Sequence, residues 1–203
     1  MSLLYMTKRI FDLLISFVGL VMIFPILLLI ACIIVIDSEG PVFYMQERIG
    51  LNGVPFLLFK FRTMHTGADR GSAITVGQRD PRITRVGYYL RKFKLDELPQ
   101  LINVLAGTMS LVGPRPEVKK FVDLYSPEQQ KVLSILPGLT DWASIHYRHE
   151  NSLLEGKEDP IRYYEEVIMP AKLALNLKYL EQRSFWVDLK ILFQTLVAIF
   201  RKE

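Results

Sequence analysis

The sequence has one cysteine, Cys32, so an intramolecular disulfide and a cysteine-based zinc cluster are both excluded. It has no phosphate loop of the GxxxxGK[ST] kind and no GxGxxG, so classical nucleotide-hydrolase and dinucleotide folds have no support. It also has no internal repeat or low-complexity segment, and its composition excludes collagen-like and disordered classes. A second long uncharged run is missing, so this sequence does not predict a polytopic membrane protein.

One long apolar run stands out in an otherwise ordinary charge balance. The 203 residues carry a net charge of +4, and residues 13–36 contain no charge. A straight helix of that length would measure roughly 36 Å, against about 30 Å for the hydrocarbon core of a bilayer. The run is too long for a signal-peptide core of about 7–15 residues. The sequence therefore predicts a membrane segment attached to a single domain.

Pro25 lies in the middle of this run and allows two topologies. One is a kinked helix that spans the membrane, which the residues alone favour. The other is a helix broken into arms of residues 13–24 and 26–36, which enters one leaflet and returns. Lys8 and Arg9 before the run favour a cytoplasmic N-terminus. The rest of the chain then lies outside if the segment spans, and inside if it returns.

The remaining sequence predicts an α+β fold, mainly helical with a small β-hairpin or sheet. Residues 41–64 read as two strands joined by a turn at residues 50–53, where Asn-Gly favours a hairpin. Helices are expected over residues 95–105, from 127 to before 137, from 160 to about 182 with a division at Pro170, and from 184 to about 200. The last helix suits either the core or a membrane interface.

The residues that carry chemistry follow a basic stretch. Residues 60–94 hold nine Lys or Arg and two acids, which suits an anionic ligand or membrane surface, or else is a solvated basic face. Asp96 and Glu97 come next, and Arg115 lies between two prolines that stiffen its backbone. Such parts hold phosphates, and a carboxylate there could bind Mg²⁺, act as a base or attack phosphorus. The alternative is that the two acids only cap a helix.

Two further ligand classes have little support. His146 and His149 are three residues apart, but without a convincing third ligand they make a weak zinc signal. Nucleic acid is a minor option, because the net charge is modest and a membrane segment would be an odd companion.

Several motifs together resemble the bacterial sugar-transferase family, the monotopic phosphoglycosyltransferases. The resemblance covers nearly the whole chain. It rests on Lys8-Arg9-x-x-Asp12, the Pro-interrupted apolar run, Gln46–Gly50, Lys60–Met64, Asp80–Gly87, Leu90–Gln100, Asn103–Leu105, Met109–Pro116 and Pro137–Thr140.

The resemblance implies transfer of a sugar 1-phosphate from a UDP-sugar to undecaprenyl phosphate, with release of UMP and a need for Mg²⁺. It assigns Asp96 as the nucleophile that forms a phosphosugar–aspartyl intermediate and as the metal ligand, and Glu97 as its assistant. The expected phosphate-binding residues are Arg91, Arg115, Arg148, Lys60 and Arg62. The rival readings are a membrane-tethered scaffold without activity, and a phosphatase or glycosidase that uses two carboxylates.

The resemblance also implies a topology, because the membrane helix of this family is re-entrant and broken at proline. Residues 1–40 would form the anchor, and residues 41–203 a cytoplasmic catalytic domain with interfacial helices on the bacterial inner membrane. Expected partners are membrane lipids and downstream glycosyltransferases of glycoconjugate assembly (capsule, O-antigen, exopolysaccharide or glycoprotein glycan), and no nucleic acid. Residues 141–148 depart from the common pattern of the family, which leaves the identity of the sugar open. Phe24 stands where some relatives have a serine, which leaves the geometry of the helix break at Pro25 open.

Overall fold

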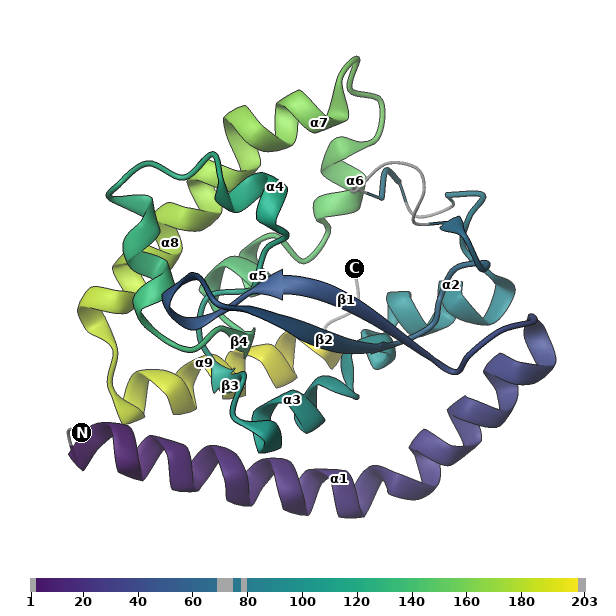
Figure 1. Cartoon of the computed structure of the whole chain (residues 1–203), viewed down its shortest axis with the longest axis horizontal. Coiled ribbons are helices and arrows are strands. Elements are labelled where there is room, and N and C mark those ends of the chain that lie inside the picture. Colours follow the sequence, from purple (N-terminus) through teal and green to yellow (C-terminus); the bar gives the residue numbers. More distant parts are fainter. Residues whose placement is uncertain (1–2, 69–74, 78–79, 201–203) are drawn as a thin grey trace.

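The computed structural model describes residues 3–68, 75–77 and 80–200. The described chain is mainly helical with two small two-stranded sheets, as predicted, and one long helix runs along its edge (Figure 1). The elements are α1 (Leu3–Asp37), β1 (Phe43–Ile49), η1 (Leu51–Gly53), β2 (Pro55–Phe61), α2 (Arg85–Lys92), η3 (Leu95–Glu97), α3 (Gln100–Ala106), β3 (Ser110–Val112), α4 (Lys119–Val122), η4 (Gln129–Ser134), β4 (Gly138–Thr140), α5 (Trp142–His146), α6 (Glu150–Leu154), α7 (Pro160–Tyr163), η5 (Tyr164–Ile168), α8 (Met169–Gln182) and α9 (Phe185–Phe200).

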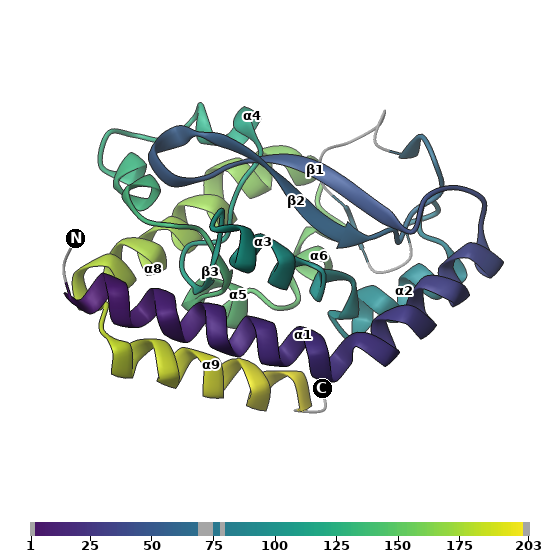
Figure 2. The same ribbon diagram turned by 60° about the horizontal axis from the view of Figure 1, so that its bottom comes forward.

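The long helix α1 passes through Pro25 without interruption, so the predicted division into two helical arms is not observed. Proline removes one backbone hydrogen bond and crowds the preceding turn, and a bend relieves the crowding without ending the helix. Figures 1 and 2 both show the second half of α1 turning away from the line of the first. Residues Met6–Asp37 are long and apolar enough to cross a membrane, and only 11% of their most apolar window is buried.

Both halves of α1 pack on the rest of the chain. The first half lies on α3 and runs beside α9, where the rings of Phe11 and Phe185 meet edge to face at 5.2 Å (Figure 2). In the second half, Ile30 and Ile34 are buried in a small core with residues of β2 and α2. The exposed remainder of α1 is apolar, as expected for a surface that faces lipid.

The predicted hairpin is confirmed. Strands β1 and β2 pair antiparallel from Phe43 opposite Phe61 to Ile49 opposite Pro55. The turn between them uses positive φ at Asn52 (55°) and Gly53 (78°), which these two residue types tolerate best. In β2, Leu58 packs in the core with Leu101 and Val104 of α3, and Lys60 lines the candidate site.

The helix predicted over residues 95–105 is divided in the structure. Residues Leu95–Glu97 form a 3₁₀ turn and the α-helix begins only at Gln100. Pro99 has no N–H to donate to the carbonyl of Leu95, so the chain makes 3₁₀-type bonds such as Leu98 N to Leu95 O (3.3 Å) instead. The helix ends at Ala106, close to the expected end at residue 105, and Gly107 follows it with φ 87°.

The later helices begin where the sequence indicated. Ser126 and Gln129 form a capping box at the start of the helix expected from residue 127, although that helix is 3₁₀. Asp159 caps α7, and α7 joins α8 through the π-helical turn η5, so Pro170 lies in the first turn of α8. Strands β3 and β4 form a short parallel pair in the middle of the molecule.

Candidate functional site

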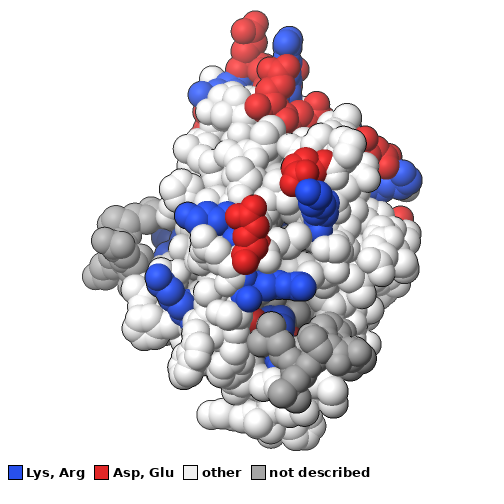
Figure 3. Space-filling view, turned by 90° about the vertical axis from the view of Figure 1, so that its left-hand side faces the viewer, with Lys and Arg blue, Asp and Glu red and all other residues white. Residues whose placement is uncertain are grey.

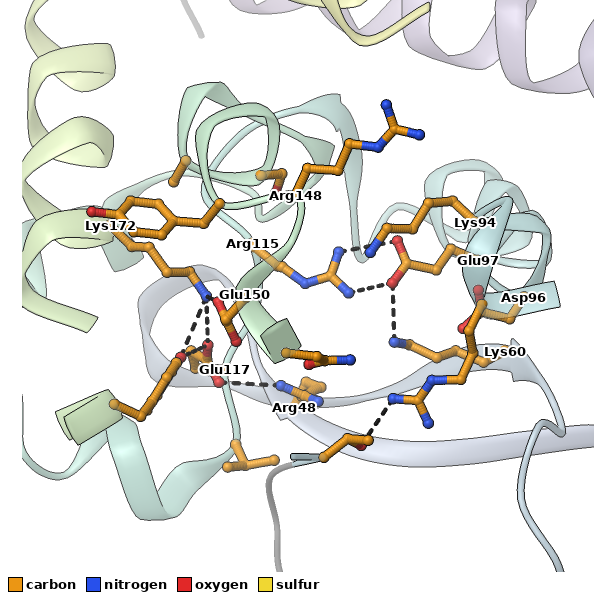
Figure 4. A pocket seen from close by; sticks show the side chains of 18 of the residues that line it. Arg48, Lys60, Lys94, Asp96, Glu97, Arg115, Glu117, Arg148, Glu150 and Lys172 are labelled. Carbon is orange, nitrogen blue, oxygen red and sulfur yellow. Dashed lines mark hydrogen bonds and ion pairs between the residues drawn. The ribbon is translucent and has the colours of Figure 1, made fainter. Parts of the chain in front are cut away.

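A cavity of about 210 Å³ opens among the hairpin, η3 and the turn after β3 (Figure 4). Residues of α2, α4, α5, α6, η5 and α8 complete its walls. Seven lysines and arginines and four carboxylates line it, so cations exceed acids by three. The cavity brings together most of the predicted site residues, namely Lys60, Arg91, Asp96, Glu97, Arg115 and Arg148. A positively charged cavity of this kind suits a phosphorylated ligand.

Local backbone geometry places the two adjacent acids differently. Helix α2 begins at the Thr84 cap, whose Oγ1 accepts from Gly87 N at 2.9 Å, and Lys94 after it takes a left-handed conformation with φ 56°. The chain thereby enters the 3₁₀ turn that carries Asp96 and Glu97. Successive side chains in such a turn diverge by about 120°, so the two carboxylates reach different surroundings.

Glu97 is held by two cations. It accepts from Lys60 Nζ at 3.2 Å and from Arg115 Nη1 at 3.1 Å, and a second short contact joins Arg115 Nη2 to the same carboxylate (Figure 4). Burial alone would raise the pKa of Glu97, but the charges of Arg115 and Lys60 outweigh it and hold that pKa well below its ordinary value. Glu97 is therefore an anion at neutral pH, and the carboxylate raises the pKa of Arg115 in return.

Asp96 is buried, and its Oδ1 has no hydrogen-bond partner in the described part of the chain. Burial raises the pKa of Asp96, and the neighbouring charge of Glu97 raises it further. Neither acid accepts a hydrogen bond from a backbone N–H of the described residues, so the interpretation of both as helix caps has no support there. A buried carboxylate oxygen that is left without a partner requires an explanation outside the fold.

That unpartnered oxygen is the test of whether these residues fit Mg²⁺. Mg²⁺ prefers oxygen ligands and is commonly held by one or two carboxylates together with substrate phosphates. Within the described ranges no cluster of three or more His, Cys, Asp or Glu could hold a metal ion. Asp96 therefore fits a metal whose other ligands come from a phosphate substrate and water. The weak zinc hypothesis at His146 and His149 finds no support there either.

The cations near Asp96 come from separate elements. Lys60 lies on β2, and burial lowers its pKa to about 8. Arg91 lies on α2, where burial lowers its pKa and its Nη2 donates to Thr75 Oγ1 at 2.9 Å. Lys94 also lines the cavity. Another member of the basic stretch, Arg82, instead forms an ion pair with Asp80 at 2.7 Å. Arg70 and Arg79 lie outside the described residues.

Close backbone packing and hydrogen bonds hold the turn around Arg115 in place. Gly113 and Gly138 approach so closely that a Cβ on Gly138 would lie 2.1 Å from Gly113 N, so neither position has room for a side chain. Gly138 N donates to Pro114 O at 2.9 Å, and Arg115 N donates to the buried Asp141 at 3.2 Å. Asp141 is one of the residues at which the sequence departs from the family pattern, and here it holds the turn.

A second ion-pair cluster, which the sequence did not predict, lines the other wall (Figure 4). Glu117 pairs with Arg48 at 3.3 Å and accepts from Tyr164 Oη at 2.5 Å, while Lys172 pairs with Glu150 at 2.8 Å. Glu117 directly follows the Pro-Arg-Pro turn, and Arg48 lies in the motif Gln46–Gly50, so the sequence could have indicated both as site residues. Glu150 and Lys172 had no such signal, because α6 and α8 meet only in three dimensions.

Three other predicted residues lie outside the cavity. Arg62 donates to Ser38 O at 2.7 Å and to Glu39 O, so it holds the turn that directly follows α1. Lys8 pairs with Asp188 of α9 at 2.5 Å, and Arg9 donates to Met109 O at 3.3 Å. The structure thus uses these basic residues to hold α1. Arg148 does line the cavity, and its side chain extends away from the Glu97 pairs in Figure 4.

Comparison with known proteins identifies the family of the chain. The profile of the family described as Bacterial sugar transferase matches residues 3–202. The undecaprenyl-phosphate glucose phosphotransferase of Komagataeibacter xylinus is 38% identical over 196 residues, which cover 93% of this chain and 35% of that protein. The UDP-glucose:undecaprenyl-phosphate glucose-1-phosphate transferase of Caulobacter vibrioides is 37% identical over 199 residues, or 97% of this chain and 70% of the relative.

A relative named for another sugar matches almost as well. The UDP-N-acetylgalactosamine-undecaprenyl-phosphate N-acetylgalactosaminephosphotransferase of Aeromonas hydrophila is 33% identical over 195 residues, which cover 95% of this chain and 43% of that protein. The chain thus spans only about 35–43% of the K. xylinus and A. hydrophila proteins. Because the match extends through almost every described element, the chain belongs to the bacterial sugar transferase family.

Proposed function

We propose that this chain transfers a sugar 1-phosphate from a UDP-sugar to undecaprenyl phosphate and releases UMP, through a covalent phosphosugar ester on Asp96. The observation that carries the proposal is the buried, unpartnered carboxylate oxygen of Asp96 in a cavity rich in cations. The names of the relatives support the two substrates. Such a step would begin the assembly of a bacterial glycoconjugate, such as a capsule, O-antigen, exopolysaccharide or glycoprotein glycan.

The transfer takes two displacements at the same phosphorus. First, an Asp96 oxygen bonds to the phosphorus that carries the sugar, and the bond to the bridging oxygen breaks, so UMP leaves with that oxygen. Second, a phosphate oxygen of undecaprenyl phosphate bonds to the same phosphorus and Asp96 leaves. Arg91, Arg115 and Lys60 neutralise the charge that accumulates when one anion attacks another.

Glu97 acts on this reaction through the cations that it holds. Its two partners, Lys60 and Arg115, come from different elements, so the carboxylate fixes both side chains beside Asp96. A Mg²⁺ held by Asp96 and the diphosphate would add Lewis-acid charge neutralisation. The carboxylate nucleophile also lets the soluble donor and the lipid acceptor react one after the other.

The re-entrant, cytoplasmic topology belongs to the same proposal. Both ends of α1 contact the catalytic domain, through Lys8 and Asp188 at one end and Arg62 and Ser38 at the other. A bilayer could not separate the two ends while both hold the same domain, which supports a helix that enters and leaves on one face. The bend of α1 supports it further (Figure 1). The membrane would be the bacterial inner membrane.

Release of UMP tests the proposed reaction. The full chain in detergent with Mg²⁺ is offered a panel of UDP-sugars, beginning with UDP-glucose and UDP-N-acetylgalactosamine, with and without undecaprenyl phosphate. We expect repeated turnover only with the acceptor. Without acceptor we expect at most one UMP per chain and a mass increase of one sugar phosphate on the peptide that contains Asp96. Normal UMP release by Asp96→Asn would contradict the nucleophile assignment.

Cysteine labelling tests the topology. In a Cys32→Ser background, single cysteines near residue 4 and residue 203 should both react only from the cytoplasmic side of inner-membrane vesicles. Labelling from opposite sides would restore a helix that spans the bilayer.

A further inference from the structure

A second cavity, of about 390 Å³, lies where α1 and α9 begin. Its walls come from the first turns of α1, the hairpin turn, β3, the end of α8 and the start of α9. It shares no lining residue with the cavity of Asp96, so it is separate from the proposed reaction site. Neither the motifs nor the proposed transfer reaction gives it a role.

The two carboxylates of this cavity are already satisfied within the fold. Asp188 pairs with Lys8 at 2.5 Å and accepts from Tyr179 Oη at 2.6 Å. Asp12 accepts from Ser110 Oγ at 2.7 Å. Both acids are buried. They are therefore not available to hold a cation that enters the cavity, and they neutralise at most two of its three basic residues.

The remaining positive charge rests on two arginines. Arg9 donates only to backbone carbonyls, to Met109 O at 3.3 Å and Leu105 O at 3.5 Å, which leaves its net charge unbalanced. Arg183 is exposed and makes no hydrogen bond or ion pair with the described part of the chain. Two guanidiniums that line one cavity without a carboxylate partner are suited to bind a phosphate.

The surroundings of the cavity are apolar. Exposed apolar side chains lie close in sequence to its lining residues, namely Met6 and Ile10 on α1 and Trp186 on α9. The Trp186 side chain is 78% exposed. Figure 3 looks onto this end of the molecule, where basic side chains lie just above a lower end that is almost free of charged side chains. A ligand for this place has an anionic head and an apolar tail, and tryptophan and arginine are typical of the headgroup level of a membrane.

We propose that this cavity binds the phosphate head group of an anionic membrane phospholipid, with Arg183 and Arg9 as its phosphate ligands. The lipid would fill the space between the starts of α1 and α9 and join both helices to the same leaflet. This proposal rests on the membrane attachment of α1 and is independent of the transfer reaction.

A thermal-unfolding titration in a nonionic detergent tests the proposal. The full chain is titrated with short-chain dihexanoyl-phosphatidylglycerol, with dihexanoyl-phosphatidylcholine and with inorganic phosphate. We expect phosphatidylglycerol to raise the melting temperature in a saturable way. For Arg183→Gln, half-saturation should need about tenfold more lipid, which corresponds to about 1.4 kcal/mol. Arg183 is exposed, so this variant should fold normally.

Lys190→Gln is the matched control, because it removes one exposed charge from α9, the helix that follows Arg183, at a position outside the cavity. It should leave the half-saturating concentration unchanged. An equal loss in both variants, or none in Arg183→Gln, would overturn the site. Equal stabilisation by inorganic phosphate would show a free-phosphate site, and equal stabilisation by phosphatidylcholine would remove the charge preference. UMP release in detergent should not change in Arg183→Gln, so the outcome stands apart from that of the transferase proposal.

Discussion

The cavity of Asp96 and the cavity at the start of α1 are built from the same types of side chain, yet they leave opposite groups without partners. In the first, Lys60 and Arg115 are paired with Glu97, and a carboxylate oxygen of Asp96 stays unpartnered. In the second, both carboxylates are paired and Arg183 stays without an ion pair among the described residues. The side chain left without a partner, more than the composition of the cavity, indicates what a cavity can do. A free carboxylate can attack or bind a metal, whereas a free guanidinium can only bind an anion.

The largest expected effect comes from Asp96→Asn. We expect the rate of UMP release to fall at least about 10³-fold, because the amide cannot act as the nucleophile. The melting temperature should stay equal or rise, because burial raises the pKa of Asp96 and the charged form therefore costs stability at neutral pH. Calorimetry beside the UMP assay checks both. A clear fall in melting temperature would mean that Asp96 is a structural group.

Asp188→Asn should show the opposite pattern. It removes the charge that balances Lys8 in a pair whose carboxylate is only 7% exposed, so we expect the free energy of unfolding to fall by about 3 kcal/mol, the low end for a buried pair because Lys8 is 25% exposed. The rate per folded molecule should change little. Asp123→Asn is the control, because its pair with Lys119 is exposed and is worth at most about 1 kcal/mol. Equal denaturation midpoints for the two variants would contradict the comparison.

The pH dependence should report on Lys60. Its pKa of about 8 predicts that kcat/KM for UMP release declines above pH 8, as the cation beside Glu97 is lost. Lys60→Arg should move this alkaline limb beyond pH 10. An alkaline limb that stays in place would assign it to another group.

The stability contribution of Lys60 has a definite sign. Its folded pKa lies below its ordinary value of 10.5, so between pH 8 and 10.5 the unfolded chain binds more protons. Lys60 therefore makes the free energy of unfolding rise over that window. Lys60→Arg should remove this rise in denaturant titrations at pH 8 and pH 10.

A smaller effect is expected from Arg62→Gln. The change removes donors to Ser38 O and Glu39 O at the end of α1, so we expect a loss of about 1–2 kcal/mol. One UMP per chain should still be released in the absence of acceptor. Arg85→Gln, an exposed change on α2, should stay within about 0.5 kcal/mol. Loss of the first UMP in Arg62→Gln alone would place Arg62 in phosphate binding.

Local signals in the sequence predicted the hairpin, and most of the predicted site residues line one cavity, because turns and motifs depend on near neighbours. The ion pair between Lys172 of α8 and Glu150 of α6 could not be predicted, since Lys172 reads in sequence as an ordinary lysine on a helix. Arg62 shows the reverse problem. It lies two residues from Lys60 in the same motif, and only the path of α1 decides that one side chain reaches the cavity and the other holds the turn that follows α1.

The attachments of α1 also bear on modularity. Removing residues 1–40, the usual way to make a soluble fragment of an anchored enzyme, would take away more than a hydrophobic tail. Asp188 would lose Lys8, Ser110 would lose Asp12, and Arg62 would lose its carbonyl acceptors. Val86 N, at the start of the helix that leads to Asp96, would lose the carboxylate of Asp37 at 3.0 Å. Helix α1 is thus part of the scaffold of the whole described chain, and a chimera with a foreign N-terminal helix would have to rebuild these contacts.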